Sequence, residues 1–232
     1  MITAGFLGCG AGLLAYGMRD AGIKVVWGID PNKLYISSFK SNFPEAEIYT
    51  KRIEDFNILP GADIWAITLP CQSFSLANQK RVENPSSLYY ALHLIHKQKP
   101  RYYFFENVPR AASYMPRNIE IRYIKACQFG NKQLRKRMFV SNFNLGLLQD
   151  SKHSLPTVMA TNSGTANSRY YPYINFETAL ERMGFKDRDL KLNGTETQKK
   201  AQLGEGVVYE MALYIGRRII EIEQQRISGS KI

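Results

Sequence analysis

The sequence predicts a doubly wound α/β fold with a mainly parallel sheet. Two observations predict it. Apolar segments typical of buried strands alternate with helical segments, and a glycine-rich loop joins the first strand to the first helix. Strands joined by helical crossovers form a parallel sheet that is covered on both faces. Such folds bind ligands at the carboxyl ends of their strands.

The first four elements follow this alternation. TAGFLG, residues 3–8, predicts a strand, and the apolar pattern after it predicts a helix over residues 13–21. KVVWGID, residues 24–30, predicts the second strand, and residues 31–43 predict the second helix.

The later elements repeat the pattern. ADIWAIT, residues 62–68, predicts a buried strand, and residues 86–98 predict the next helix. Two further strands are expected over residues 101–107 and 136–142. Residues 207–225 space their apolar side chains for one helix face, so we expect this last helix to pack on the cofactor side of the sheet.

Composition restricts the class of protein. A chain of 232 residues is long enough for one domain with a substantial core. Hydrophobic residues at 44% and aromatic residues at 12% exclude a disordered chain. The net charge of +11 favours a polyanionic partner, because phosphate contacts release counterions.

The cysteines and the N-terminus indicate the compartment. Cys9, Cys71 and Cys127 are far apart and lack the spacing of a zinc site, so we expect a reduced, intracellular, cytoplasmic protein without a structural metal. Residues 2–18 carry no charge, but they contain five glycines and no preceding basic region. They predict a strand, loop and helix rather than a signal peptide or membrane span.

The glycine loop predicts a nucleoside cofactor. Gly10, Gly12 and Ala15 follow the first strand and open the first helix, and Asp30 ends the next strand. Glycines there allow a tight turn and close ligand approach, while an acid at this distance can hydrogen-bond ribose hydroxyls. NAD and S-adenosylmethionine (AdoMet) both remain open on these residues alone.

Further motifs resemble those of the DNA cytosine-5 methyltransferases, in the family's order from the N-terminus to the last helix. Beside the glycine loop and Asp30, they are PCQSFS at 70–75, FENVP at 105–109, QLRKR at 133–137 and GEGVV at 204–208. The resemblance implies a Rossmann-like AdoMet-dependent methyltransferase fold. The implied cofactor-binding residues are Phe6, Leu7, Gly8, Cys9, Gly10, Gly12, Leu13, Asp30, Pro31, Ile53, Pro70, Glu205 and Val207.

The resemblance also implies a chemistry. Carbon 5 of cytosine is a poor nucleophile, so a thiolate from Cys71 adds to carbon 6 and activates the ring. A small buried thiol is the alternative interpretation of a lone cysteine. Glu106, at a strand end where burial raises its pKa, is expected at nitrogen 3 of the base. Arg135 and Arg137 alternate along a strand and are expected to contact the base, the phosphates and the Cys71 loop.

Duplex DNA is the expected partner, with the target cytosine turned out of the stack. The polar, basic segment 75–87 suits a loop that closes on DNA. The expected DNA-binding residues are Gln72, Ser75, Lys80, Arg81, Gln133 and Arg169. The competing interpretation of these positions is a solvated polar surface.

The chain departs from the family pattern in places. Arg52 stands where an adenine-binding aspartate is expected, with Glu54 and Asp55 as substitutes; Leu69 replaces a proline, and Glu205 replaces an asparagine. Residues 1–140 are expected to form the catalytic core and residues 174–232 to pack back on it. Residues 141–173 leave room only for a very small recognition element, unless a partner chain supplies recognition.

The expected function is AdoMet-dependent methyl transfer to carbon 5 of cytosine in DNA, at a short or relaxed target. Two alternatives remain open. One is a tRNA cytosine-5 methyltransferase on the same scaffold, and the other is a catalytically weak, partner-dependent DNA-binding module.

Overall fold

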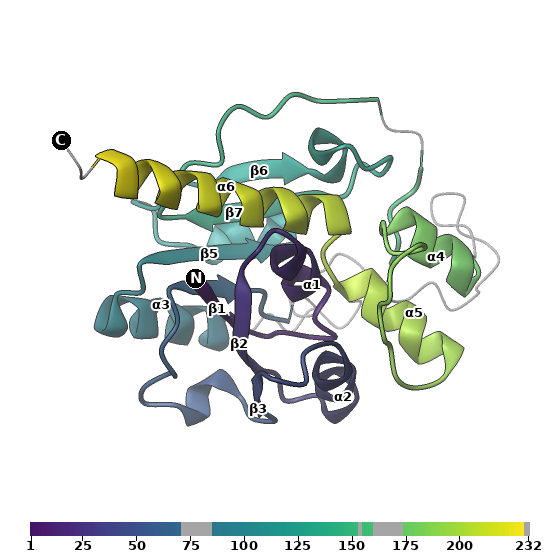
Figure 1. Ribbon diagram of the computed structural model, residues 1–232, viewed down its shortest axis with the longest axis horizontal. Helices are drawn as coiled ribbons and strands as arrows, with labels where there is room; N and C mark the ends of the chain where they lie inside the picture. The colour runs from purple at the N-terminus through teal and green to yellow at the C-terminus, as the bar shows by residue number, and fades with distance from the viewer. Residues whose placement is uncertain (71–84, 153–154, 160–173, 230–232) are drawn as a thin grey trace.

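Seven strands form one sheet in the order β3-β2-β1-β4-β5-β7-β6 in a computed structural model of the chain (Figure 1). The structure describes residues 1–70, 85–152, 155–159 and 174–229. The strands are β1 Thr3–Leu7, β2 Lys24–Ile29, β3 Glu47–Tyr49, β4 Ile64–Ile67, β5 Tyr102–Asn107, β6 Arg122–Lys125 and β7 Lys136–Ser141. The helices are α1 Leu13–Asp20, α2 Lys33–Asn42, α3 Ser86–Gln98, α4 Phe176–Arg182, α5 Glu196–Glu205 and α6 Tyr209–Gly229.

The predicted doubly wound, mainly parallel sheet is confirmed. Strands β3, β2, β1, β4 and β5 run parallel, whereas β7 is antiparallel to both β5 and β6. The carboxyl ends of β1, β4 and β5 and the first residues of β7 therefore meet at the same edge of the sheet. Strands β3 and β6 were not predicted, because β3 has three residues and β6 begins and ends with a charged residue.

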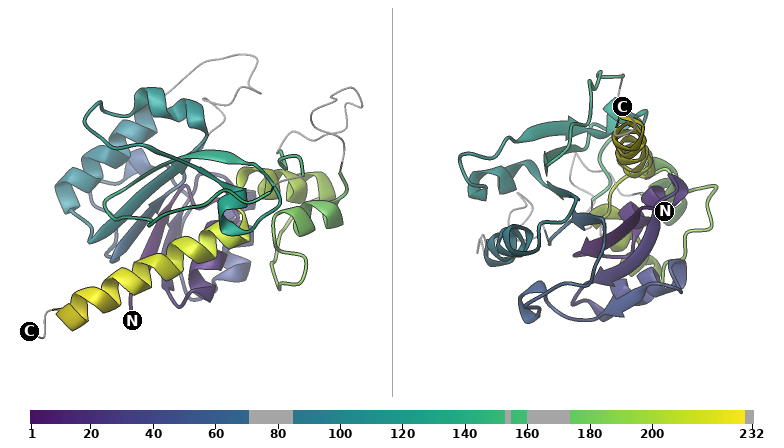
Figure 2. Two further views of the ribbon diagram at one scale, coloured as in Figure 1. Left: turned by 90° about the horizontal axis from the view of Figure 1, so that it is seen from above. Right: turned by 60° about the vertical axis from the view of Figure 1, so that its left-hand side comes forward.

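Helices cover both faces, and each face has its own core. The larger core lies under α1, α2 and α6 and includes Phe39, Phe104 and Ile215. The second core lies under α3 and includes Trp65 and Leu94. Figure 2, left, shows the sheet between α3 on one side and α6 on the other.

The last helix packs directly on the helix that follows the glycine loop. A Cβ on Gly17 of α1 would lie 2.5 Å from the Cβ of Ala212, and one on Gly216 of α6 would lie 2.7 Å from the Cβ of Ala21. Both glycines are therefore required by this close approach. The packing of the final helix on the cofactor side is confirmed, and the helix runs from Tyr209 to Gly229 rather than over residues 207–225.

The chain after β7 joins the core instead of projecting from it. Leu145 is fully buried, its carbonyl accepts a hydrogen bond from the Tyr214 hydroxyl at 2.9 Å, and the carbonyl of Asn144 accepts one from Arg218 at 2.9 Å. Asn144 and Leu145 are thereby fixed along α6. Among the described residues, no helix has the length and apolar character needed to cross a membrane.

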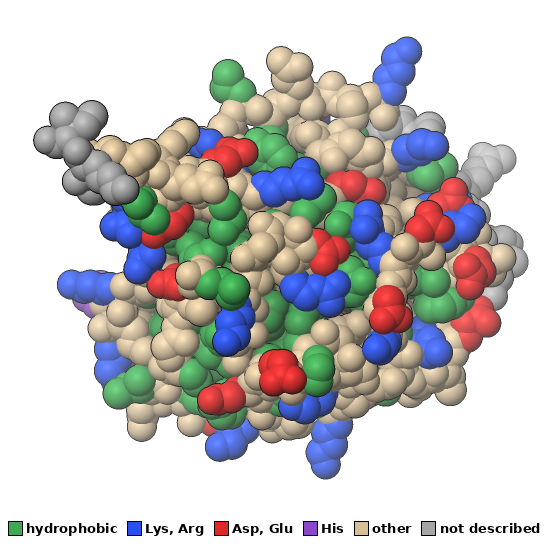
Figure 3. Space-filling model, in the orientation of Figure 1, with side chains coloured by type: hydrophobic (Ala, Val, Ile, Leu, Met, Phe, Trp, Pro, Cys, Tyr) green, Lys and Arg blue, Asp and Glu red, His purple; other side chains and the backbone are tan. Residues whose placement is uncertain are grey.

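Charges of both signs are mixed on the face that α6 crosses. Figure 3 shows Lys and Arg side chains interspersed with Asp and Glu over this face. The net charge of +11 is therefore not gathered there into a continuous basic surface.

Candidate active site

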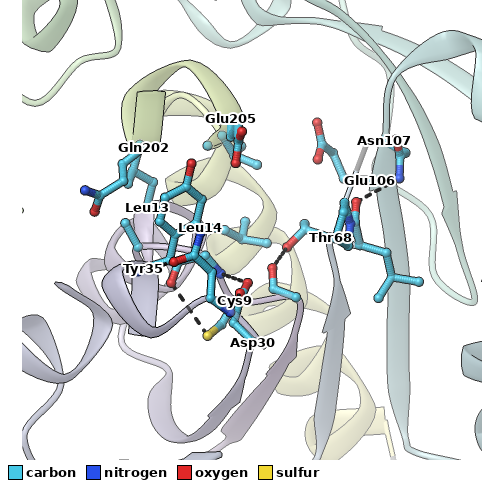
Figure 4. Close-up of a pocket in the computed structure, with 18 of the residues that line it drawn as sticks. Cys9, Leu13, Leu14, Asp30, Tyr35, Thr68, Glu106, Asn107, Gln202 and Glu205 are labelled. Atoms are coloured by element: carbon cyan, nitrogen blue, oxygen red, sulfur yellow. Dashed lines mark hydrogen bonds between the residues drawn. The ribbon is translucent and has the colours of Figure 1, made fainter. Parts of the chain in front are cut away.

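A cavity lies at the carboxyl edge of the parallel strands, where the fold class predicts a ligand site. It is formed by the glycine loop, the ends of β2, β4 and β5, the start of β7 and the end of α5 (Figure 4). The predicted cofactor residues Gly8, Cys9, Gly10, Leu13, Asp30, Pro31, Pro70, Glu205 and Val207 line it, together with Glu106 and Arg137.

The glycine loop is held in shape by backbone contacts. Gly8 has a φ of +68°, and a Cβ there would lie 2.6 Å from the Thr68 carbonyl oxygen, so the close approach of β1 to β4 requires glycine. The Asp30 carboxylate accepts hydrogen bonds from the backbone N–H groups of Gly10 and Asn32, each at 2.9 Å. Asp30 therefore shapes the loop while it lines the cavity.

Burial governs the ionisable groups on this side of the cavity. Burial raises the pKa of Asp30, its two backbone donors oppose that rise, and the nearby Glu205 carboxylate adds to it. Burial, with the Asp30 charge, raises the pKa of the Cys9 thiol well above its usual range. Cys9 is therefore a neutral thiol at neutral pH and lines the cavity as an apolar group.

Four predicted cofactor residues do not line the cavity. Phe6, Leu7 and Ile53 are buried in the two cores. Gly12 has a φ of +90°, and a Cβ there would lie 2.8 Å from the Phe43 ring. Phe6 and Leu7 belong to β1, and alternate residues of a strand point to opposite faces of the sheet, so their side chains enter the two cores instead of the cavity.

The residues after β4 are fixed on both sides. The Thr68 hydroxyl donates to the Gly8 carbonyl at 2.9 Å, and the Asn107 amide donates to the Leu69 carbonyl at 3.1 Å. Pro70, which precedes Cys71 in the sequence, lines the cavity. Cys71 itself lies outside the described residues, as do Gln72, Ser75, Lys80, Arg81 and Arg169.

Glu106 and Arg137 form a buried ion pair at the far wall of the cavity. Arg137 Nε donates to Glu106 Oε1 at 2.9 Å, and the two side chains are 15% and 8% exposed. Burial raises the pKa of Glu106, whereas the Arg137 and Arg135 guanidinium groups lower it. Figure 4 shows Glu106 across the cavity from Cys9 and Leu13. This is the strand-end position that the sequence predicts for Glu106.

Arg135 does not share that position, which corrects the prediction that it alternates with Arg137 along a strand. It lies before β7 with a φ of +26°, and it is 2% exposed. Its guanidinium donates to the carbonyl oxygens of Val158, Gly204 and Gly206 at 2.6 to 2.7 Å. Arg135 therefore joins the segment at Val158 to the C-terminal end of α5 by hydrogen bonds, and it does not line the cavity.

Gln133 is likewise structural in this geometry. It is fully buried, accepts a hydrogen bond from the Val158 N–H at 2.8 Å and donates to the Arg182 carbonyl at 2.7 Å. A fully buried amide with both ends bonded does not reach a DNA surface, so the prediction that Gln133 contacts DNA is wrong for this structure. Its position in a family-like motif gave no indication of burial.

Sequence reasoning missed part of the cavity wall. Leu14, Asn32, Tyr35 and Gln202 also line the cavity. Gln202 and Glu205 are three residues apart near the end of α5, so helical spacing places them on neighbouring turns of one face. That spacing beside the last motif was the available signal for Gln202. Arg52, Glu54 and Asp55 do not line the cavity. The Asp55 carboxylate accepts a hydrogen bond from the backbone N–H of Arg52, and the Glu54 carboxylate accepts one from the Ser87 hydroxyl.

Comparison with known proteins agrees with this geometry. The sequence profile described as "C-5 cytosine-specific DNA methylase" matches residues 6–119, which include the glycine loop, Pro70, Cys71 and Glu106. Over these residues the chain is similar to the C-5 cytosine-specific DNA methylases. It is 27% identical to the Type II methyltransferase M.AgeI of Thalassovita gelatinovora, in an alignment that covers 57% of this chain and 37% of that protein. The alignment thus spans well under half the length of that relative.

Solved structures share the fold of this chain over nearly its whole length. A prophage-encoded protein of E. coli, assigned as a DNA modification methyltransferase, superposes with a TM-score of 0.73 at 14% identity, covering 97% of this chain and all of that one. The Dnmt2 methyltransferase of S. pombe superposes with a TM-score of 0.70 at 15% identity, covering 95% of this chain and 99% of that one. At these identities the likeness concerns the fold.

Proposed function

We propose that the chain transfers a methyl group from AdoMet to carbon 5 of cytosine in DNA, with Cys71 as the nucleophile. One observation carries the proposal. A single cavity is lined by the glycine loop with Asp30 on one side and by the Glu106–Arg137 ion pair on the other, with Pro70 between them. The similarity of residues 6–119 to the cytosine-specific DNA methylases supports this pairing of a cofactor side with a base side.

The glycine-loop side of the cavity fits AdoMet. Asp30 presents a buried carboxylate for ribose hydroxyls, and a Cβ on Gly10 would meet no atom within 4 Å, so the loop is open toward the cavity. Leu13 and Tyr35 add an apolar wall for a flat base. When bound, AdoMet supplies an electrophilic methyl group on a sulfonium. Asp30, Leu13 and Tyr35 hold and orient the ligand.

The opposite side fits a cytosine ring. The Cys71 thiolate would add to carbon 6, and carbon 5 would then take the methyl group of AdoMet, which leaves as S-adenosylhomocysteine. Solvent water would take the carbon 5 proton as the double bond re-forms, and the carbon–sulfur bond would break to release the thiolate. Glu106 donates a proton or hydrogen bond to nitrogen 3 as the ring gains electron density, and its raised pKa favours that role. Arg137 holds the Glu106 carboxyl in place at 2.9 Å.

The DNA target is proposed to be short. Asn144 and Leu145 are fixed along α6, so only part of the 141–173 segment remains for contact with the groove. Phosphate contacts by a chain of net charge +11 then supply most of the affinity and no sequence information.

Trapping of the covalent adduct tests the mechanism. Duplex DNA with 5-fluorocytosine blocks loss of the carbon 5 substituent, so we expect the wild type to form a denaturant-resistant complex with it in the presence of AdoMet. Cys71→Ser should form none, because a serine hydroxyl is a far weaker nucleophile than a thiolate. Cys127→Ser, which removes a buried cysteine outside the cavity, is the matched control and should still form the adduct. A wild-type adduct that survives Cys71→Ser contradicts the mechanism.

A further inference from the structure

Two threonine hydroxyls join β1 to β4, one at each end of this strand pair. At the amino end, the Thr3 hydroxyl donates to an Asp63 carboxylate oxygen at 2.9 Å. At the carboxyl end, the Thr68 hydroxyl donates to the Gly8 carbonyl oxygen at 2.9 Å. Thr68 also lines the cavity. Its hydrogen bond therefore joins the end of β4 to the glycine loop within the candidate active site.

The segment after β4 is held from two directions. Besides the bond from Thr68 to the glycine loop, the Asn107 amide at the end of β5 donates to the Leu69 carbonyl oxygen at 3.1 Å. Figure 4 shows both hydrogen bonds as dashed lines. The fit against the glycine loop is close, since a Cβ on Gly8 would lie 2.6 Å from the Thr68 carbonyl oxygen and 3.1 Å from the Leu69 Cα. The glycine loop and β5 thus fix the start of this segment together.

The glycine loop has supports that do not involve the Thr68 hydroxyl. Its backbone N–H groups at Gly8 and Cys9 donate to the Ile29 carbonyl oxygen at 2.9 and 3.0 Å. Asp30 accepts a further hydrogen bond from this loop at 2.9 Å. Loss of the Thr68 hydroxyl should therefore loosen the segment after β4 and leave the shape of the ligand-binding loop largely intact.

We propose that Thr68 is a positioning residue that sets the distance between the nucleophile and the methyl donor. The inference rests on the proposed function, in which the base is bonded to Cys71 while AdoMet lies on the glycine loop. Cys71 is three residues after Thr68 in the sequence, so the end of β4 sets where the nucleophile segment begins. Methyl transfer needs the reacting atoms about 3–3.5 Å apart, and a small misplacement lowers the rate steeply. The hydrogen bond from Thr68 to Gly8 holds the two sides at one separation.

Single-turnover methyl transfer to genomic DNA that lacks 5-methylcytosine, at saturating AdoMet and DNA, tests the proposal. Thr68→Val removes the hydroxyl and keeps the shape of the side chain, so we expect the rate to fall by about ten- to a hundredfold. The dissociation constant of AdoMet, measured by calorimetry, should stay within about twofold of the wild-type value, because the substitution acts on the transfer step and not on cofactor binding. Thr68→Ser keeps the hydroxyl and should retain most of the rate.

Thr3→Val is the matched control. It removes the corresponding hydroxyl at the other end of the same two strands, away from the cavity. A threonine hydroxyl that only stabilises the β1–β4 pair should behave alike at either end. We therefore expect Thr3→Val to keep the wild-type rate and the wild-type affinity for AdoMet, whatever its effect on the free energy of unfolding.

The outcomes separate the inference from the proposed function. Equal rates in wild type and Thr68→Val overturn the inference and leave methyl transfer standing. The same holds if the loss disappears when AdoMet is raised to saturation, or if Thr68→Ser loses as much as Thr68→Val. A wild type that transfers no methyl group overturns both. If Thr68→Val does not fold, Thr68→Ala, which also lacks the hydroxyl, decides by the same two measurements.

Discussion

At the scale of single residues, Asp30 does two tasks at once. Its carboxylate oxygens accept hydrogen bonds from Gly10 and Asn32, and the same carboxylate faces the cavity. Each oxygen has a second lone pair that remains for a ligand. Removal of the side chain therefore removes a ligand contact and also frees the glycine loop.

We expect Asp30→Ala to weaken AdoMet binding by about 1.5–3 kcal/mol, the range for a hydrogen bond to a charged group. Isothermal calorimetry measures the loss. Asp189→Ala, which removes a largely exposed carboxylate elsewhere, is the control and should bind as the wild type does. AdoMet affinity that is the same in Asp30→Ala and wild type would refute the assignment of the ribose side of the cavity.

At the scale of elements, Glu223 links α6 to the start of β5, at the amino-terminal edge of the parallel strands. Glu223 accepts hydrogen bonds from Arg226 and Arg101 at 2.7 and 2.8 Å, and from the Tyr102 hydroxyl at 2.8 Å. These donors, with Arg226 the largest contributor, lower the pKa of Glu223 from 4.5 to about 2. The network lies away from the cavity, so it affects folding rather than ligand binding.

The lowered pKa fixes the sign of a pH dependence. A carboxyl whose pKa is lower in the folded state stabilises the fold at pH values above its unfolded pKa, and the contribution is lost as the pH falls through the folded value. We expect Glu223→Gln to lower the free energy of unfolding by about 1.5–3 kcal/mol near pH 7, and by less as the pH falls from 4.5 toward 2. Urea unfolding of both proteins across this range measures the difference. Glu221→Gln, an exposed position on the same helix, should change stability by less than about 0.5 kcal/mol. A loss of unfolding free energy in Glu223→Gln that becomes larger as the pH falls would contradict the role assigned to Glu223.

The sequence predicted most strands of the fold but not the contacts between residues that are distant in the sequence. Alternating apolar runs predicted β1, β2, β4, β5 and β7, and the strand ends placed Asp30 and Glu106 at the cavity. The local sequence pattern could not predict the hydrogen bonds of Arg135, because its partners Val158, Gly204 and Gly206 are 23 to 71 residues away in the sequence. The burial of Gln133 has the same cause, since Arg182 lies 49 residues away.

At the scale of the whole molecule, the short chain and its charge lead to a prediction about DNA binding. If the target is as short as proposed, most affinity should come from phosphates. The logarithm of the binding constant should then fall with the logarithm of salt concentration by about 0.9 per phosphate neutralised. Fluorescence anisotropy with duplexes of different sequence should give similar slopes. Affinity that does not change between low and physiological salt would show that phosphate contacts contribute little.

The central claim is methyl transfer to carbon 5 of cytosine in DNA. The most direct measurement incubates the chain with AdoMet labelled in its methyl group and with duplex DNA or tRNA, digests the nucleic acid and separates the nucleosides. We predict label in 5-methyl-2′-deoxycytidine from DNA with the wild type, and none with Cys71→Ser. Label confined to tRNA, label on another atom, or no transfer from a chain that binds AdoMet would contradict the claim.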